Sequence, residues 1–228
     1  MNEFQTDGAA DARCHLLLAH GAGAPMTSPF LEKMTVLLTE RDLAVSRFEF
    51  GYMAARRHGG KRRPPPRAER LVDEYIAAVT ELWERLPPKQ TLLIGGKSMG
   101  GRVASLCADT LHAERKIAGL VCLGYPFHPP GKPENLRTAH LQTLRCPALI
   151  VQGERDPFGD RSEVDGYGLA PSIKVVWIGD GDHDLGPRGG SGFTRAGNLA
   201  TAADAVAAFA ERLGEKDGPQ RKRQRGRG

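Results

Sequence analysis

The sequence predicts a single α/β domain, built on a doubly wound and mainly parallel sheet with helices on both faces. Three observations point to this fold class. Short apolar runs alternate along the chain with longer segments of helical periodicity. Most of these apolar runs are near-continuous, as in strands that are covered on both faces. The 228 residues, 40% of them hydrophobic, are enough for one sizeable core and too few for two large domains.

Six apolar runs are the expected strands. Connections long enough to hold a helix make consecutive strands parallel, so their carboxyl ends meet at one edge of the sheet. Ligands bind at that edge in sheets of this kind. The expected strands are residues 15–20, 43–50, 90–96, 117–125, 147–153 and 173–179.

Helical periodicity fills most of the segments between these strands. The last helix is the clearest, because Leu199, Ala202, Val206 and Phe209 lie on one apolar stripe. The expected helices are residues 28–40, 67–86, 99–112, 134–144 and 197–213.

The domain is expected to span residues 14–214, between a flexible N-terminus (1–13) and a disordered basic tail (215–228). The last eight residues carry five basic groups and no acid, which accounts for the net charge of +5 and leaves the body formally neutral. Such a tail cannot bury apolar surface. It either solubilises the protein or contacts polyanions weakly, so no specific nucleic-acid partner is expected.

Other bulk features exclude several classes of protein. No segment resembles a signal peptide or reaches the roughly 18 apolar residues of a membrane span, which favours a cytoplasmic protein. A monomer or homodimer is expected. The four cysteines lack C-x-x-C spacing and are interpreted as buried thiols rather than metal ligands. They are Cys14, Cys107, Cys122 and Cys146.

The stretch TLLIGGKSMGGR, residues 91–102, carries the central motif. Its Gly-Lys-Ser matches the end of an ATP-type phosphate loop, and its Gly-Lys-Ser-Met-Gly matches the nucleophile elbow G-x-S-x-G. A phosphate loop needs a glycine at the position of Thr91 and a loop after it, whereas apolar strand residues follow. The elbow hypothesis fits better, with Ser98 as nucleophile between Gly96 and Gly100, where side chains would collide with the backbone.

Candidate partners for Ser98 follow two of the expected strands that come after the elbow. Asp156 comes after the strand 147–153, and His183 comes after the strand 173–179. A serine nucleophile needs a base to take its proton and a carboxylate to orient that base. We therefore expect Ser98, His183 and Asp156 to act together. Rival carboxylates remain, since Glu154, Asp160 and the acids that flank His183 lie close in sequence.

The glycine-rich segment HGAGAPMTSPF directly follows the first strand. A turn there can aim a backbone N–H at a developing oxyanion, and the residue after the nucleophile supplies a second donor. These donors are expected to be Ala22 and Met99. His20 is expected to support the loop rather than to take part in chemistry.

With these motifs in place, the chain resembles a small α/β-hydrolase of the dienelactone hydrolase group. More narrowly, it is similar to bacterial proteins grouped with testis-expressed protein 30 and the third subunit of the NSL chromatin complex. The resemblance rests on LLLAHGAGAPMTSPF, FEFGYM, GGKSMGGRVAS, GERDPFG and DHDLGPRGGSG. It implies the hydrolase fold, the triad Ser98, Asp156 and His183, and no metal or organic cofactor. Because the dienelactone hydrolases commonly use cysteine, their specific chemistry is not carried over.

The function expected from these residues is hydrolysis of a small ester, thioester or lactone through an acyl-enzyme. Residues 126–146 are too few for a cap domain, so an open site is expected. The basic segment ARRHGGKRRPPPR, with Arg56 and Arg57, either attracts an anionic substrate or is a solvated loop. Lys97, beside the nucleophile, either contributes to a preference for anionic substrates or pairs with a nearby acid. The alternative function is a non-catalytic interaction module, as in chromatin-associated relatives.

Overall fold

The computed structural model describes residues 2–57, 59–60 and 64–216. The described residues form one seven-stranded sheet in the order β1-β3-β2-β4-β5-β6-β7. Every neighbouring pair is parallel except β1 and β3, which are antiparallel. The doubly wound, mainly parallel sheet is therefore confirmed. The strands are β1 (Gln5–Asp7), β2 (Cys14–Ala19), β3 (Leu43–Phe48), β4 (Thr91–Lys97), β5 (Gly119–Leu123), β6 (Ala148–Gly153) and β7 (Ile173–Ile178).

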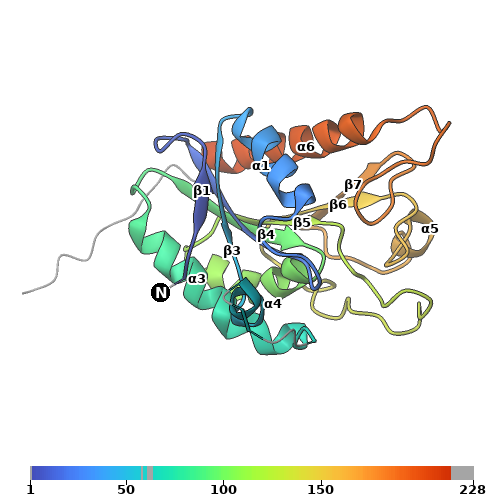
Figure 1. The fold of residues 1–228 in the computed structure, drawn as a ribbon, viewed down its shortest axis with the longest axis horizontal. Coiled ribbons are helices and arrows are strands. Elements are labelled where there is room, and N and C mark those ends of the chain that lie inside the picture. Colours follow the sequence, from blue (N-terminus) through green and yellow to red (C-terminus); the bar gives the residue numbers. More distant parts are fainter. Residues whose placement is uncertain (1, 58, 61–63, 217–228) are drawn as a thin grey trace, which may run out of the picture.

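Helices cover both faces of the sheet (Figure 1). The helices α1 and α6 contact each other on one face, and α3 and α4 contact each other on the other. Two clusters of buried apolar side chains fill the space beneath them. The helices are α1 (Pro29–Thr39), α2 (Gly51–Arg57), η1 (Ala68–Leu71), α3 (Val72–Arg85), α4 (Met99–Ala113), α5 (Arg161–Val164) and α6 (Arg195–Lys216).

The helix expected at residues 134–144 is wrong, because this segment consists of turns and bends. Leu141 is buried, as its apolar side chain suggests. However, the Arg137 N–H donates to the Phe127 carbonyl at 2.7 Å, and the Tyr125 hydroxyl donates to the Arg137 carbonyl at 3.1 Å. The segment therefore forms hydrogen bonds with the residues that follow β5 instead of the internal hydrogen bonds of a helix.

Strand β1 lies within the segment 1–13, for which a flexible N-terminus was expected. Its polar sequence gives no hydrophobic signal, and side-chain contacts accompany its antiparallel pairing with β3. The hydroxyls of Thr6 and Ser46 lie 2.7 Å apart, and Arg47 pairs with Asp7 at 2.9 Å. The short helices α2 and α5 also have no counterpart in the expected elements.

All four cysteines are free and buried, which confirms their interpretation as thiols of the core. Within the ranges given above, none of the helices is long and apolar enough to cross a membrane. Of the disordered basic tail expected at residues 215–228, Glu215 and Lys216 instead end α6, and residues 217–228 lie outside the described residues.

Candidate active site

Ser98 lies at a sharp turn between β4 and α4. Its φ of 52° and ψ of −118° are strained for a residue that carries a side chain. Two glycines make room for this turn, since a Cβ on Gly96 would lie 2.6 Å from the Ala19 carbonyl oxygen. A Cβ on Gly100 would lie 2.5 Å from the same oxygen. This is the geometry expected of a nucleophile elbow.

The phosphate-loop alternative does not fit this geometry. Leu92, Leu93 and Ile94 occupy the position where a phosphate loop would run, and all three lie buried within β4. Their backbone groups pair with β2 and β5. They are therefore not free to surround a phosphate group.

His183 lies between Ser98 and Asp156, although the three residues come from separate segments of the chain. Its Nε2 is 2.8 Å from the Ser98 Oγ, and its Nδ1 is 2.8 Å from the Asp156 Oδ2. An Nδ1 proton donated to the carboxylate leaves the Nε2 lone pair directed at the serine hydroxyl. The arrangement can therefore take a proton from Ser98 during nucleophilic attack.

Asp156 is fully buried, and its side chain is held on both oxygens. Gln152 Nε2 donates to Oδ2 at 2.9 Å, and the Phe158 N–H donates to Oδ1 at 2.9 Å. Gln152 also accepts the Tyr125 N–H at 2.7 Å through its Oε1, which fixes the direction of its amide group. Sequence reasoning missed Gln152, whose signal was one amide in an otherwise apolar strand.

The rival carboxylates that follow β6 have other partners. Glu154 pairs with Arg161 at 3.1 Å. Asp160 caps α5, where it exchanges hydrogen bonds with Glu163 in a capping box. These two acids therefore stabilise the turn that presents Asp156.

The acids near His183 are also engaged. Hydrogen bonds from Arg188, followed by the charge of Arg155, lower the pKa of Asp180. Asp182 accepts the N–H groups of Asp184 and Gly186 at 2.9 and 2.8 Å, which closes the turn around His183.

The glycine-rich loop after β2 approaches the elbow, where a Cβ on Gly21 would lie 3.8 Å from the Ser98 Cβ. His20 Nδ1 lies 2.6 Å from the Gly21 carbonyl, and its Nε2 accepts the Phe50 N–H at 3.2 Å. Burial lowers the pKa of His20 to about 4, so its imidazole is neutral near pH 7. His20 therefore supports the loop, as expected from the sequence.

The two expected oxyanion donors come from two separate segments, both next to the elbow. Met99 is the first residue of α4, and Ala22 lies in the loop after β2. The Tyr52 hydroxyl donates to the Ala22 carbonyl at 3.0 Å, which restrains this peptide. Tyr52 comes from α2, an element that the sequence did not reveal, and burial raises its pKa to about 12.

Lys97 is buried and pairs with an acid, which is the second of the two roles considered for it. Its ammonium lies 3.2 Å from the Asp184 Oδ1 and donates to the His183 carbonyl at 2.7 Å. The ammonium is thus directed at the histidine loop.

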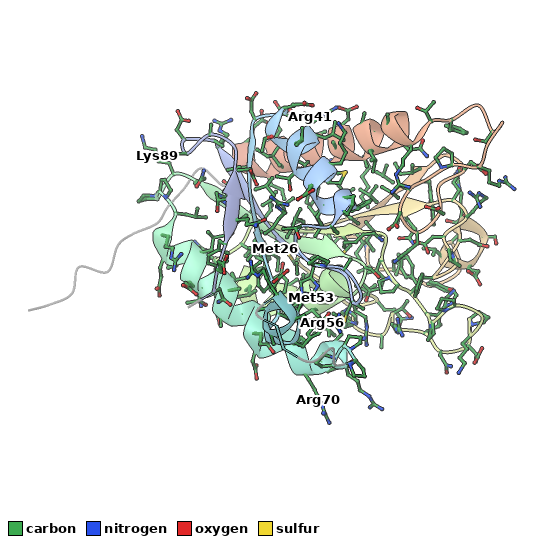
Figure 2. All side chains as sticks on the ribbon, in the orientation of Figure 1. Met26, Arg41, Met53, Arg56, Arg70 and Lys89 are labelled. Atoms are coloured by element: carbon green, nitrogen blue, oxygen red, sulfur yellow. The ribbon has the colours of Figure 1, made fainter. Side chains whose placement is uncertain are left out.

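Arg56 and Arg57 lie on α2, which follows the carboxyl end of β3. Arg57 pairs with Glu3 at 3.0 Å and with Glu49 at 3.4 Å. The Arg56 guanidinium lies 5.4 Å from the Tyr52 ring centroid, next to Met53 (Figure 2). His58, Lys61, Arg62 and Arg63 of this basic segment lie outside the described residues.

A surface cavity of about 750 Å³ belongs to a different part of the molecule. It is lined in part by Arg13 and Gln90, which precede β2 and β4. Lys89, another of its lining residues, is well separated from Arg56 in Figure 2. The cavity therefore lies at the amino edge of the sheet, whereas Ser98 follows the carboxyl end of β4.

Comparison with known proteins agrees with this architecture. The family described as an alpha/beta hydrolase domain matches residues 12–211. Dienelactone hydrolase from Anabaena variabilis superposes with a TM-score of 0.69, at 18% identity over 92% of this chain and 91% of that one. An α/β serine hydrolase without lid from Xanthomonas campestris gives 0.66, at 18% identity over 92% and 88%. Est1E from Butyrivibrio proteoclasticus, with ferulic acid bound, gives 0.63, at 18% identity over 93% and 95%.

Proposed function

Because the chain belongs to the alpha/beta hydrolase domain family, we propose that it is a serine hydrolase of ester-like substrates, with Ser98, His183 and Asp156 as its catalytic triad. The observation that carries the proposal is the continuous chain of two 2.8 Å contacts from the Ser98 Oγ through His183 to Asp156. The strained backbone at Ser98 supports it, since strain of this kind is commonly kept at functional sites.

In the proposed reaction, the Ser98 Oγ attacks the substrate carbonyl carbon while its proton passes to His183 Nε2. The Ala22 and Met99 N–H groups stabilise the oxyanion of the tetrahedral intermediate. The intermediate collapses to an acyl-enzyme, and the leaving group takes the proton from His183. Water then attacks the acyl group by the reverse route, which restores Ser98. Asp156 keeps His183 in the required tautomer throughout.

The substrate class proposed is a small carboxylic ester, thioester or lactone. The 126–146 segment is too short for a cap, which supports an open site and a small or surface-presented acyl group. Ferulic acid is bound to Est1E and not to this chain, but a structural neighbour that binds a carboxylic acid is compatible with this substrate class. No metal or organic cofactor takes part in the proposed chemistry, and a cytoplasmic monomer or homodimer remains our expectation.

The narrower resemblance to the relatives of testis-expressed protein 30 supplies the alternative, a non-catalytic interaction module. The alignment of Ser98, His183 and Asp156 favours the enzyme. A scaffold does not need these three residue types to converge from three separate segments.

The test is hydrolysis of a panel of short-chain esters, thioesters and lactones by the purified protein and by Ser98→Ala. We expect turnover by the wild type and loss of roughly 10³-fold or more in the variant, whose remaining groups give only residual catalysis. Equal turnover by both proteins would overturn the assignment of Ser98.

A further inference from the structure

We propose that Lys97 is a positioning residue, which holds the backbone of His183 against the strand that carries the nucleophile. The inference rests on the proposed function, because it concerns how the Ser98–His183 pair is kept aligned. Lys97 acts through the backbone of His183 rather than by contact with the reacting atoms.

The burial of Lys97 requires an explanation. Its side chain is only 9% exposed, whereas lysine ammonium groups nearly always reach water. A buried ammonium is costly unless its N–H groups are satisfied. Lys97 meets that condition with three neighbours, namely the His183 carbonyl at 2.7 Å, Asp184 at 3.2 Å and the Phe30 ring, whose centroid is 5.2 Å away.

The backbone at the end of β5 leaves room for this contact. Gly124 has a φ of 66°, and a Cβ there would lie 3.0 Å from the Lys97 Nζ and 2.8 Å from the His183 carbonyl oxygen. A side chain at this position would press on both members of the hydrogen bond. The glycine therefore permits the ammonium and the histidine loop to meet.

The hydrogen bond closes a ring of contacts around the candidate base. Lys97 is covalently joined to Ser98, and its ammonium binds the carbonyl of the residue whose imidazole contacts the Ser98 Oγ. His183 is thus held at its side chain by Asp156 and at its backbone by Lys97. Displacement of either end would move Nε2 away from the serine.

The charge of Lys97 is balanced by acids on the histidine loop and on the turn after β6. The other titratable groups that act on the ammonium are Asp184, Asp156 and Asp182. Burial lowers the pKa of Lys97, and the charge of Asp184 opposes this shift. The ion pair with Asp184 therefore favours the charged ammonium, which is the stronger donor to the His183 carbonyl.

The test compares Lys97→Met, which keeps the length of the side chain and cannot donate, with the wild type. The matched control is Lys116→Met, which removes a surface lysine paired with Glu114. The measurement is the rate of labelling at increasing concentrations of a fluorophosphonate probe, which gives the maximal rate and the apparent affinity separately. For Lys97→Met we expect a maximal rate about 10²-fold lower and an unchanged affinity, because the histidine is misplaced while the probe still binds. Lys116→Met should match the wild type.

A second variant keeps the inference testable if Lys97→Met does not fold. Asp184→Asn retains the hydrogen bond from Lys97 to the His183 carbonyl but removes one negative charge. We expect its maximal rate and affinity to stay within a few-fold of the wild type, because the contact of Lys97 with the His183 carbonyl remains. A wild-type rate in a folded Lys97→Met protein, or a loss of about 10²-fold in Asp184→Asn, would overturn the inference alone. Absence of labelling in the wild type itself would overturn the proposed function, and this inference with it.

Discussion

At the scale of single residues, the account depends on the tautomer of His183, which Asp156 fixes through the 2.8 Å contact at Nδ1. Asp156→Asn would present an amide in place of the carboxylate and favour the opposite tautomer. We expect kcat to fall roughly 10⁴-fold with little change in fold. Steady-state kinetics on any ester that the wild type hydrolyses would measure this effect.

Asp160→Asn is the matched control for that variant. It changes a nearby carboxylate that caps α5 and does not touch His183. Its kcat should remain within a few-fold of the wild type. If Asp160→Asn lost as much activity as Asp156→Asn, the choice of Asp156 over its rivals would be wrong.

The variant Gln152→Leu tests how much the hydrogen bonds around Asp156 contribute to stability. Its Nε2 lies within 3.1 Å of Asp156, the Tyr125 carbonyl and the Gly159 carbonyl. Gln152→Leu would leave buried groups without partners, which should lower the free energy of unfolding by about 1–3 kcal/mol for a group left unpaired. Urea unfolding measures the loss. An unchanged midpoint would show that these hydrogen bonds add nothing to stability.

At the scale of elements, the elbow between β4 and α4 depends on its close backbone contacts. Gly100→Ala would place a Cβ 2.5 Å from the Ala19 carbonyl oxygen and 2.6 Å from the His20 carbonyl oxygen. We expect about 1–3 kcal/mol of destabilisation from this overpacking, measured by chemical denaturation. Gly23→Ala is the control, because a Cβ there meets nothing within 4 Å. Equal effects of the two substitutions would contradict this explanation of the elbow.

The elements that the sequence predicts well are those with a strong apolar pattern. All six expected strands are present, with bounds within two residues of those in the structure. The helix expected at 134–144 is wrong because hydrogen bonds to residues outside the segment, such as that of Arg137 to Phe127, outweigh the local pattern. The strand β1 and the helix α2 escaped notice because they are short and depend on tertiary contacts.

The same distinction holds for the site. Ser98, Asp156 and His183 could be chosen because each follows a recognisable strand and matches a motif. The contacts of Lys97 could not be assigned, since His183 and Asp184 lie far away in sequence. Gln152 was missed because a single amide in an apolar strand does not reveal its partners, although Asp156 is only four residues away. Tyr52 was missed because only the fold brings α2 to the Ala22 loop.

At the scale of the whole molecule, buried histidines predict how stability changes with pH. Burial lowers the pKa of both His15 and His20 from 6.5 to about 4. Between these values the unfolded chain binds protons that the native protein does not, so stability falls as the pH drops from 6.5 towards 4. Each histidine contributes a slope of roughly 1.4 kcal/mol per pH unit in this window.

Urea unfolding at several pH values would measure this dependence. His15→Leu removes one of the two groups, and its slope between pH 6.5 and 4 should be smaller than that of the wild type. An identical slope in the variant would show that His15 is already protonated in the native state.

The central claim concerns the whole assembly, in which three segments of the chain make Ser98 an activated nucleophile. The most direct measurement is labelling of the purified protein by a fluorophosphonate probe, with the modified peptide identified by mass spectrometry, beside Ser98→Ala and His183→Ala. The account predicts modification of Ser98 in the wild type and loss of labelling in both variants. A folded wild-type protein that is not labelled, or is labelled equally without His183, would contradict it.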